Sequence, residues 1–147
     1  MIPQISTLNE TNTISKIVPY PSFTFFVNND LIEGNIDGLA SLRQTIRHIL
    51  TTERYVYPIY SPNYGVELEQ LIGKSMGYAK AKINNIIKNA LLQDDRIIKV
   101  DIINKVSNGD ILSIDVKVLS VLGEFVEELD FKIWQLLARW WIEYQTI

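Results

Sequence analysis

Two internal segments repeat apolar side chains every three to four residues, which is the spacing of an amphipathic helix. The first follows Asp37, and Arg43, Gln44 and Arg47 lie opposite its apolar side. The apolar positions are Leu39, Leu42, Ile46, Ile49 and Leu50 in the first segment and Ala79, Ile83, Ile86, Ile87, Ala90 and Leu91 in the second. We predict helices here, with Asp37 and Ser75 as N-caps, because short polar side chains accept hydrogen bonds from first-turn amides.

The apolar period changes to two in the last third of the chain, which predicts strands. Residues 111–121 alternate apolar and polar side chains, and a turn at 107–110 separates them from a strand predicted at 97–106. Another alternating segment, 125–131, follows. The inward positions of 111–121 are Leu112, Ile114, Val116 and Val118. These segments predict an antiparallel meander.

The remaining elements are shorter. Residues 23–27 and 31–36 are predicted to form a hairpin, and residues 66–72 a short helix that ends at Gly73. Between helices, residues 53–65 contain two prolines and are expected to form an ordered loop. Because strands cluster instead of alternating with helices, the predicted fold is α+β, with two to three helices packed on a small antiparallel sheet.

The two ends of the chain are predicted to extend beyond a core of residues 23–131. Residues 1–22 lack a regular apolar period and are expected to form an extended arm, either a loose terminus or one that orders on a partner. Residues 132–147 predict an amphipathic helix that covers the protein's own sheet or binds a partner. This helix carries all three tryptophans, Trp134, Trp140 and Trp141.

Composition excludes several classes of function. The chain has 147 residues, a formal net charge of −3, one histidine and no cysteine. Disulfides, thiol chemistry and sites that need two imidazoles are therefore excluded, and we expect no metal and no cofactor. No concentrated basic face is present for nucleic acid, and no segment has the pattern of a signal peptide or membrane span. We expect one soluble domain that folds in a reducing cytoplasm.

One enzymatic alternative is a glycan hydrolase, which needs two carboxyl groups at a defined separation across a cleft. The acids available to it are Glu53, Glu67, Glu69, Asp94 and Asp95. The sequence does not give their separation, and surface or ion-paired acids are the commoner interpretation. We therefore expect a protein that is not an enzyme.

Charged and aromatic residues near the helix ends are candidates for partner contacts. Arg54 and Arg96 each follow acidic residues and could make two-pronged bonds to carboxylates, which fix orientation more than they add stability. The alternative is solvated charge of little energetic consequence. Tyrosines concentrate in the loop, and their rings favour interfaces. The candidates from these segments are Glu53, Arg54, Tyr55, Tyr60, Tyr64, Asp94, Asp95 and Arg96.

The sequence resembles the small baseplate wedge protein of contractile tails, in the branch from Gram-positive prophages, myophages and phage-tail-like bacteriocins. The resemblance runs from about Phe23 to Phe131 and is most specific over residues 52–68. The residues that carry it are Ile36 to Leu39, Gln44, Ile46, Ile49, Leu50, Thr52 to Tyr55, Pro58 to Ser61, Asn63 to Leu68, Leu71 to Gly73 and Ala90 to Ile97. The family's usual Glu-Pro-Arg signature corresponds here to Asp94, Asp95 and Arg96, so the acid is shorter and the proline is missing.

This resemblance implies a structural part, the sheath initiator, present in six copies in the baseplate of a phage tail or bacteriocin particle assembled in the bacterial cytoplasm. It implies contacts with the sheath protein, with large wedge proteins and with tube or hub proteins. It also implies that a strand edge of the meander is extended by the first sheath ring through β-augmentation. The candidate residues for this contact are Val116, Val118 and Leu129, and the sequence does not show which strand edge meets the sheath. Some relatives carry a lysozyme label, which no residue pattern in this sequence supports.

Overall fold

The structure, a computed structural model, describes residues 22–28 and 31–132. Its elements are β1 (Thr24–Asn28), β2 (Leu31–Ile36), α1 (Gly38–Thr51), the 3₁₀ helix η1 (Glu69–Leu71), α2 (Met76–Leu91), β3 (Ile97–Asn108), β4 (Ile111–Ser120) and β5 (Gly123–Lys132). Two helices and two small antiparallel sheets confirm the predicted α+β class. The predicted arm, apart from Ser22, and the C-terminal helix with Trp134, Trp140 and Trp141 lie outside the described residues.

Both predicted N-caps are confirmed. The Asp37 carboxylate accepts from the backbone N–H of Gly38, and the Ser75 hydroxyl accepts from that of Tyr78. The short helix predicted over 66–72 is only the single 3₁₀ turn of η1. Gly73 follows it with φ +72°, a conformation that favours glycine. No helix in the described part of the chain has the length and apolar character needed to cross a membrane.

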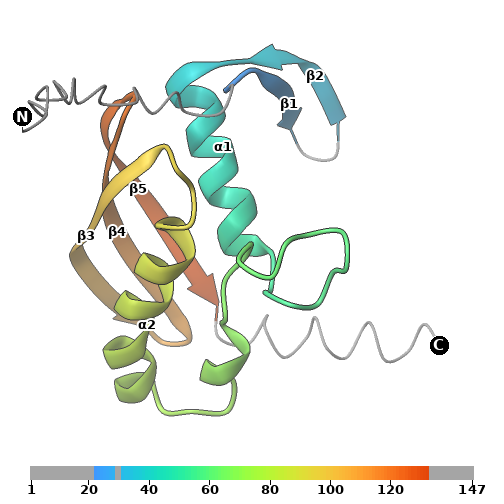
Figure 1. Ribbon diagram of the computed structural model, residues 1–147. Coiled ribbons are helices and arrows are strands. Elements are labelled where there is room, and N and C mark those ends of the chain that lie inside the picture. Colours follow the sequence, from blue (N-terminus) through green and yellow to red (C-terminus); the bar gives the residue numbers. More distant parts are fainter. Residues whose placement is uncertain (1–21, 29–30, 133–147) are drawn as a thin grey trace, which may run out of the picture.

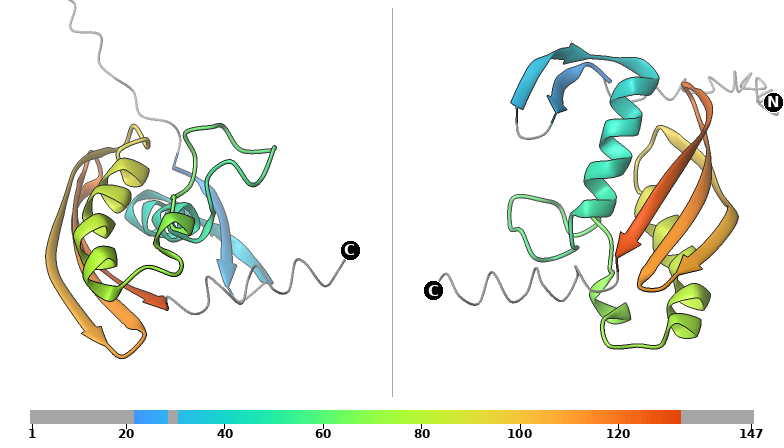
Figure 2. Two further views of the ribbon diagram at one scale, coloured as in Figure 1. Left: turned by 90° about the horizontal axis from the view of Figure 1, so that it is seen from below. Right: turned by 180° about the vertical axis from the view of Figure 1, so that it is seen from behind.

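The three-stranded sheet packs its inner face on both helices. The strand order is β3-β4-β5, and Figure 2 shows this sheet curving around α2. The predicted alternation is confirmed, because the inward side chains of β4 are buried. They join the buried faces of α1 and α2 in one apolar core, whose least exposed members include Leu42, Ile46, Ile83, Ile87, Leu91, Leu112, Ile114, Val116 and Val118. Burial of this apolar area is the main stabilising contribution to the fold.

The expectation that Val116 and Val118 offer a strand edge to a partner is wrong. Both residues lie on β4, which pairs with β3 on one side and β5 on the other. Both side chains are fully buried in the core. Alternation along one strand predicts which side chains point inward, but it does not predict whether the strand is central or at an edge. Leu129 lies on the outer strand β5 and is half-buried against the core.

A two-stranded hairpin stands apart from this core. Figure 1 shows β1 and β2 beside the N-terminal half of α1, on the side away from the larger sheet. The hairpin is tied to α1 by Gln44, whose side-chain amide donates to the carbonyl of Phe25 at 2.9 Å and accepts from the N–H of Val27 at 3.0 Å. Gln44 lies on the polar side predicted from the sequence, but its contact with β1 was not predictable from helical spacing.

Two other polar residues of α1, Arg43 and Arg47, hold β5. Glu127 points inward from β5 with only 4% of its area exposed, and Arg47 binds its Oε1 through Nη2 at 2.6 Å and Nε at 2.7 Å. Arg43 lies 3.9 Å from the other carboxylate oxygen and stacks over the Phe125 ring, 5.0 Å from its centroid. These contacts of Arg43 and Arg47 clamp β5 onto α1. They therefore place charged groups at the boundary of the core.

Candidate partner-binding site

Residues 53–65 are here called the tyrosine loop. Two backbone hydrogen bonds, here called the closure, join the ends of this loop. Arg54 N–H donates to the carbonyl of Val66, and Val66 N–H donates to the carbonyl of Thr52, both at 2.9 Å. Gly65 lies beside this closure with φ +99°. A Cβ at this position would lie 2.7 Å from the carbonyl oxygen of Thr52. The close approach of the two backbones therefore requires glycine.

The side chains of Glu53 and Arg54 are used within the chain at the base of this loop. The Glu53 carboxylate accepts from the backbone N–H groups of Leu68 and Glu69 at 3.2 and 3.1 Å, at the start of η1. Arg54 donates to Glu67 at 2.9 Å and to the carbonyl of Gly65 at 3.0 Å. The prediction of a two-pronged carboxylate bond is thus wrong for Arg54, because one prong reaches a backbone carbonyl. Both side chains shape the loop.

The tyrosines of the loop form a ladder of rings. Tyr60 stacks on Tyr64 with centroids 4.5 Å apart, and Tyr57 meets Tyr60 edge to face at 6.3 Å. Burial raises the pKa of the half-buried Tyr64 phenol, and the neighbouring Tyr60 and Asp94 add to the effect. Tyr55 is 72% exposed and has φ +69°. Tyr57 and Tyr60 are exposed at one end of the ladder, and Tyr64 packs against the core at the other end.

Asp94 and Arg96 form the second candidate group, between α2 and β3. Arg96 donates through Nε to Asp94 Oδ1 at 2.9 Å and through Nη2 to Oδ2 at 2.6 Å, so the predicted two-pronged bond is confirmed for Arg96. Both side chains are 10% exposed. Asp94 Oδ1 also accepts from the backbone N–H of Arg96 at 3.0 Å, and Ile97 N–H donates to the carbonyl of Asp94 at 3.0 Å. These bonds hold the bend without the proline of the family signature.

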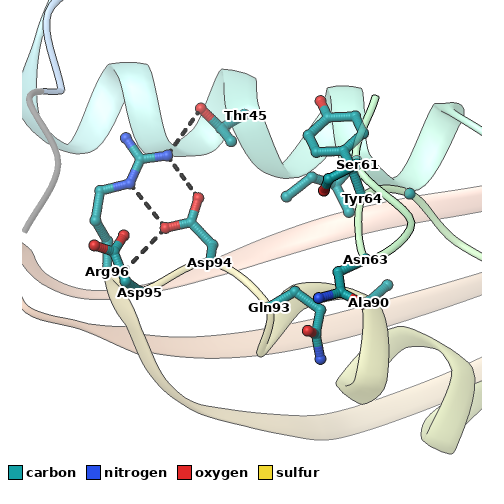
Figure 3. Close-up of a pocket in the computed structure, with 11 residues that line it drawn as sticks. Thr45, Ser61, Asn63, Tyr64, Ala90, Gln93, Asp94, Asp95 and Arg96 are labelled. Atoms are coloured by element: carbon teal, nitrogen blue, oxygen red, sulfur yellow. Dashed lines mark hydrogen bonds and ion pairs between the residues drawn. The ribbon is translucent and has the colours of Figure 1, made fainter. Parts of the chain in front are cut away.

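A pocket of about 370 Å³ lies between the tyrosine loop, α1 and this bend. Figure 3 shows Tyr64 and Ser61 on one side and the Asp94–Arg96 pair on the other. The structure thus brings together Tyr64, Asp94, Asp95 and Arg96 from two distant segments of the sequence. Sequence reasoning missed Thr45, whose hydroxyl accepts from Arg96 Nη2 at 3.3 Å. In the sequence, the only indication of this role is the position of Thr45, a polar residue, next to the apolar stripe of α1.

The carboxylates here are engaged in structural bonds. Burial alone would raise the pKa of Asp94, but the hydrogen bonds and charge of Arg96 outweigh burial and hold it below its usual value of 3.8. Burial raises the pKa of Glu53 in spite of the two N–H donors from Glu69 and Leu68. A raised pKa suits a general acid, yet both Glu53 oxygens already accept backbone hydrogen bonds.

The lowered pKa of Asp94 predicts acid sensitivity. A carboxyl group with a depressed folded-state pKa contributes stability above its unfolded pKa and loses it as the pH falls through the folded value. We expect the stability difference between the wild type and Asp94→Asn to be largest above about pH 4 and to shrink below it. Urea unfolding of both proteins between about pH 2.5 and 7 measures this difference, and a constant difference over that range would contradict the assignment.

The sequence matches a family of known proteins and a curated relative. Residues 21–123 match the family model described as contractile injection system sheath initiator. The chain is also 38% identical over 88 residues to phage-like element PBSX protein XkdS of Bacillus subtilis strain 168. That alignment covers 58% of this chain and 62% of the relative, so it spans less than two thirds of the relative's length.

Proposed function

Because this chain belongs to the sheath initiator family of contractile injection systems, we propose that it docks on wedge proteins of a baseplate and templates the first sheath ring by β-augmentation. In this mode, an extended segment of one protein adds a strand to an exposed sheet edge of another, and main-chain hydrogen bonds supply the affinity. The protein then acts as a structural component and not as an enzyme.

One observation carries this proposal. The larger sheet has the order β3-β4-β5, and among the described residues no strand pairs with the outer side of β3 or of β5. Its inner face is fixed on α1 and α2 by the apolar core. An unpaired edge on a rigid sheet is a template for another chain and an aggregation risk that soluble proteins usually suppress. A role in templating explains why this protein keeps an unpaired strand edge.

Docking on the wedge proteins is assigned to the tyrosine loop and the adjoining pocket. The loop exposes Tyr55, Ile59 and Tyr60, and Ile59 is 84% exposed. The bonds at the loop base and the ring ladder order the loop before binding, which reduces the entropy lost on association. The pocket adds a concave surface with Asp94, Asp95 and Arg96 on one wall. Aromatic anchors around a concave surface are typical of protein interfaces.

Deletion of the gene in the producing strain tests the proposal. We expect particles in which tube and baseplate form but sheath is missing, with sheath restored by the wild-type gene on a plasmid. Electron microscopy reads the outcome, and mass spectrometry of purified particles should find this chain in the finished structure. Normally sheathed particles from the deletion strain would contradict templating, and absence of the chain from particles would indicate an assembly chaperone instead.

A peptidoglycan assay tests the enzymatic alternative directly. The purified chain is expected to release no reducing sugar above the background of a heat-denatured sample. Release that disappears in Glu53→Gln or Asp95→Asn would instead assign glycan hydrolysis to these carboxylates.

A further inference from the structure

The two sheets present four outer strand edges in the described part of the chain, and their regularity differs. A strand can add only where successive backbone N–H and C=O groups point outward at regular intervals. Bulges, short strands and covering side chains prevent such addition. Comparison of the four edges therefore indicates where a partner strand fits, within the proposed function of the previous subsection.

Both edges of the β1–β2 hairpin are obstructed. On β1, the Gln44 side chain already occupies the carbonyl of Phe25 and the N–H of Val27. On β2, the register shifts between the pair that includes Phe25 and the pair that includes Val27. Between these two pairs, β2 contributes one residue more than β1. Gly34 lies within this bulge with φ +69°. A bulge of this kind twists the strand and interrupts the regular spacing of the outward groups.

The β3 edge is also irregular. β3 has 12 residues where β4 has 10, and the register shifts between Ile97 and Lys99 and again between Ile102 and Asn104. The two extra residues, Ile98 and Ile103, are exposed. These bulges disrupt the outward hydrogen-bonding pattern in the first half of the strand.

The β5 edge is regular over its whole length. Every residue of β5 pairs with β4 without a register shift, from Gly123 with Ser120 to Lys132 with Ile111. The Ser120–Gly123 pair closes a two-residue turn and therefore exchanges hydrogen bonds, as does every second pair after it. The backbone groups of the alternate residues thus point away from β4. These residues are Glu124, Val126, Glu128, Asp130 and Lys132.

The outer face next to this edge carries an uncompensated pair of like charges. Asp115 on β4 lies directly opposite Glu128 on β5, an arrangement that destabilises an antiparallel pair. The neighbouring Lys117 is bound to Glu124 instead, and Asp130 accepts from the Ser113 hydroxyl at 2.6 Å. Among the described residues, no cation pairs with Asp115 or Glu128. A basic residue on an added strand would lie beside Glu128 and supply the counter-charge.

We propose that the outer edge of β5 receives the partner strand, and that this strand is an extended segment with a lysine or arginine beside Glu128. The inward carboxylate of Glu127 does not prevent this addition, because Arg47 neutralises it from α1. The proposal rests on the templating function above and adds to it the strand edge and the charge of the partner segment.

Proline substitution at matched positions of the two edges tests the location. Proline at Val126 removes an outward N–H and leaves the β4–β5 hydrogen bonds intact, a position at which edge strands tolerate proline. Ser107→Pro makes the equivalent change on β3, since Ser107 and Leu112 form a pair that does not exchange hydrogen bonds. We expect Val126→Pro to weaken binding to the sheath protein of the same particle by about tenfold, and Ser107→Pro to leave it unchanged.

Hydrogen–deuterium exchange of the full chain with that sheath protein separates the outcomes. New protection of β5 amides with β3 unchanged supports the proposal. Protection confined to β3 overturns the β5 assignment and leaves templating intact. Absence of both binding and protection in the wild type would overturn the templating function itself and, with it, this assignment.

Charge reversal at Glu128 tests the partner's charge through two effects of opposite sign. Glu128→Lys gives Asp115 an opposite charge directly across the strands, so the isolated chain should gain about 1–5 °C in Tm. The same change places like charges beside the added strand, so binding should weaken about tenfold. The affinity should also no longer increase as the salt concentration is lowered. Asp110→Lys, in the β3–β4 turn, is the control that should change neither. Unchanged or tighter binding by Glu128→Lys would overturn the basic partner strand.

Discussion

Replacement of Arg96 by methionine is expected to lower the free energy of unfolding by about 3–5 kcal/mol. Methionine keeps much of the apolar volume but removes the guanidinium that makes two hydrogen bonds to Asp94. The Asp94 carboxylate, only 10% exposed, would then be buried without its cation. An unpaired buried charge costs more than the intact pair contributes. Urea unfolding at pH 7 measures the loss.

Two further variants identify the cause of this loss. In the double variant Asp94→Asn with Arg96→Met, no charge remains to be left unpaired, so much of the stability should return. Lys99→Met removes a cation from the exposed pair that Lys99 forms with Asp101 at 2.7 Å, and it should change stability by less than about 0.5 kcal/mol. If Arg96→Met lost no more than Lys99→Met, the Asp94–Arg96 pair would not hold the bend between α2 and β3.

Features that depend on neighbouring residues could be predicted from the sequence. A cap requires one polar side chain and the amides one to three residues later, so Asp37 and Ser75 were identifiable from their positions before apolar stripes. The bond of Arg96 to Asp94 is equally local, because the residues are two positions apart. Alternation in β4 likewise predicts its buried face, since side chains of a strand point to opposite sides in turn.

Contacts between distant elements could not be predicted in this way. The inward position of Glu127 on β5 was predictable, but its partner Arg47 lies 80 residues earlier in the chain. The hydrogen bond from Arg96 to Thr45 spans 51 residues. Strand order is also long-range information, and for this reason the alternation around Val116 does not reveal that it lies on the central strand. The pocket follows from such contacts and has no local signature.

Alanine at Gly65 is expected to cost about 2–4 kcal/mol of folding stability and to displace the tyrosine loop. Two effects add at this position. The φ of +99° is unfavourable for any residue with a side chain. The new Cβ would also lie 2.7 Å from the carbonyl oxygen of Thr52 and 3.2 Å from the backbone nitrogen of Arg54. Neither backbone atom can move without loosening the closure that Arg54 and Val66 form with their hydrogen bonds.

Gly73→Ala provides a matched control. Gly73 also has a positive φ, +72°, but a Cβ there would meet no atom within 4 Å. Its substitution should therefore show the conformational cost alone, about 1–2 kcal/mol. The excess loss in Gly65→Ala measures the backbone clash, and it should be accompanied by faster amide exchange at Arg54 and Val66 and by weaker binding to wedge proteins. Equal losses of folding stability at the two glycines, with amide exchange at Arg54 and Val66 unchanged, would contradict this prediction. They would show that the Thr52 carbonyl moves aside without cost and that the closure does not determine the position of the loop.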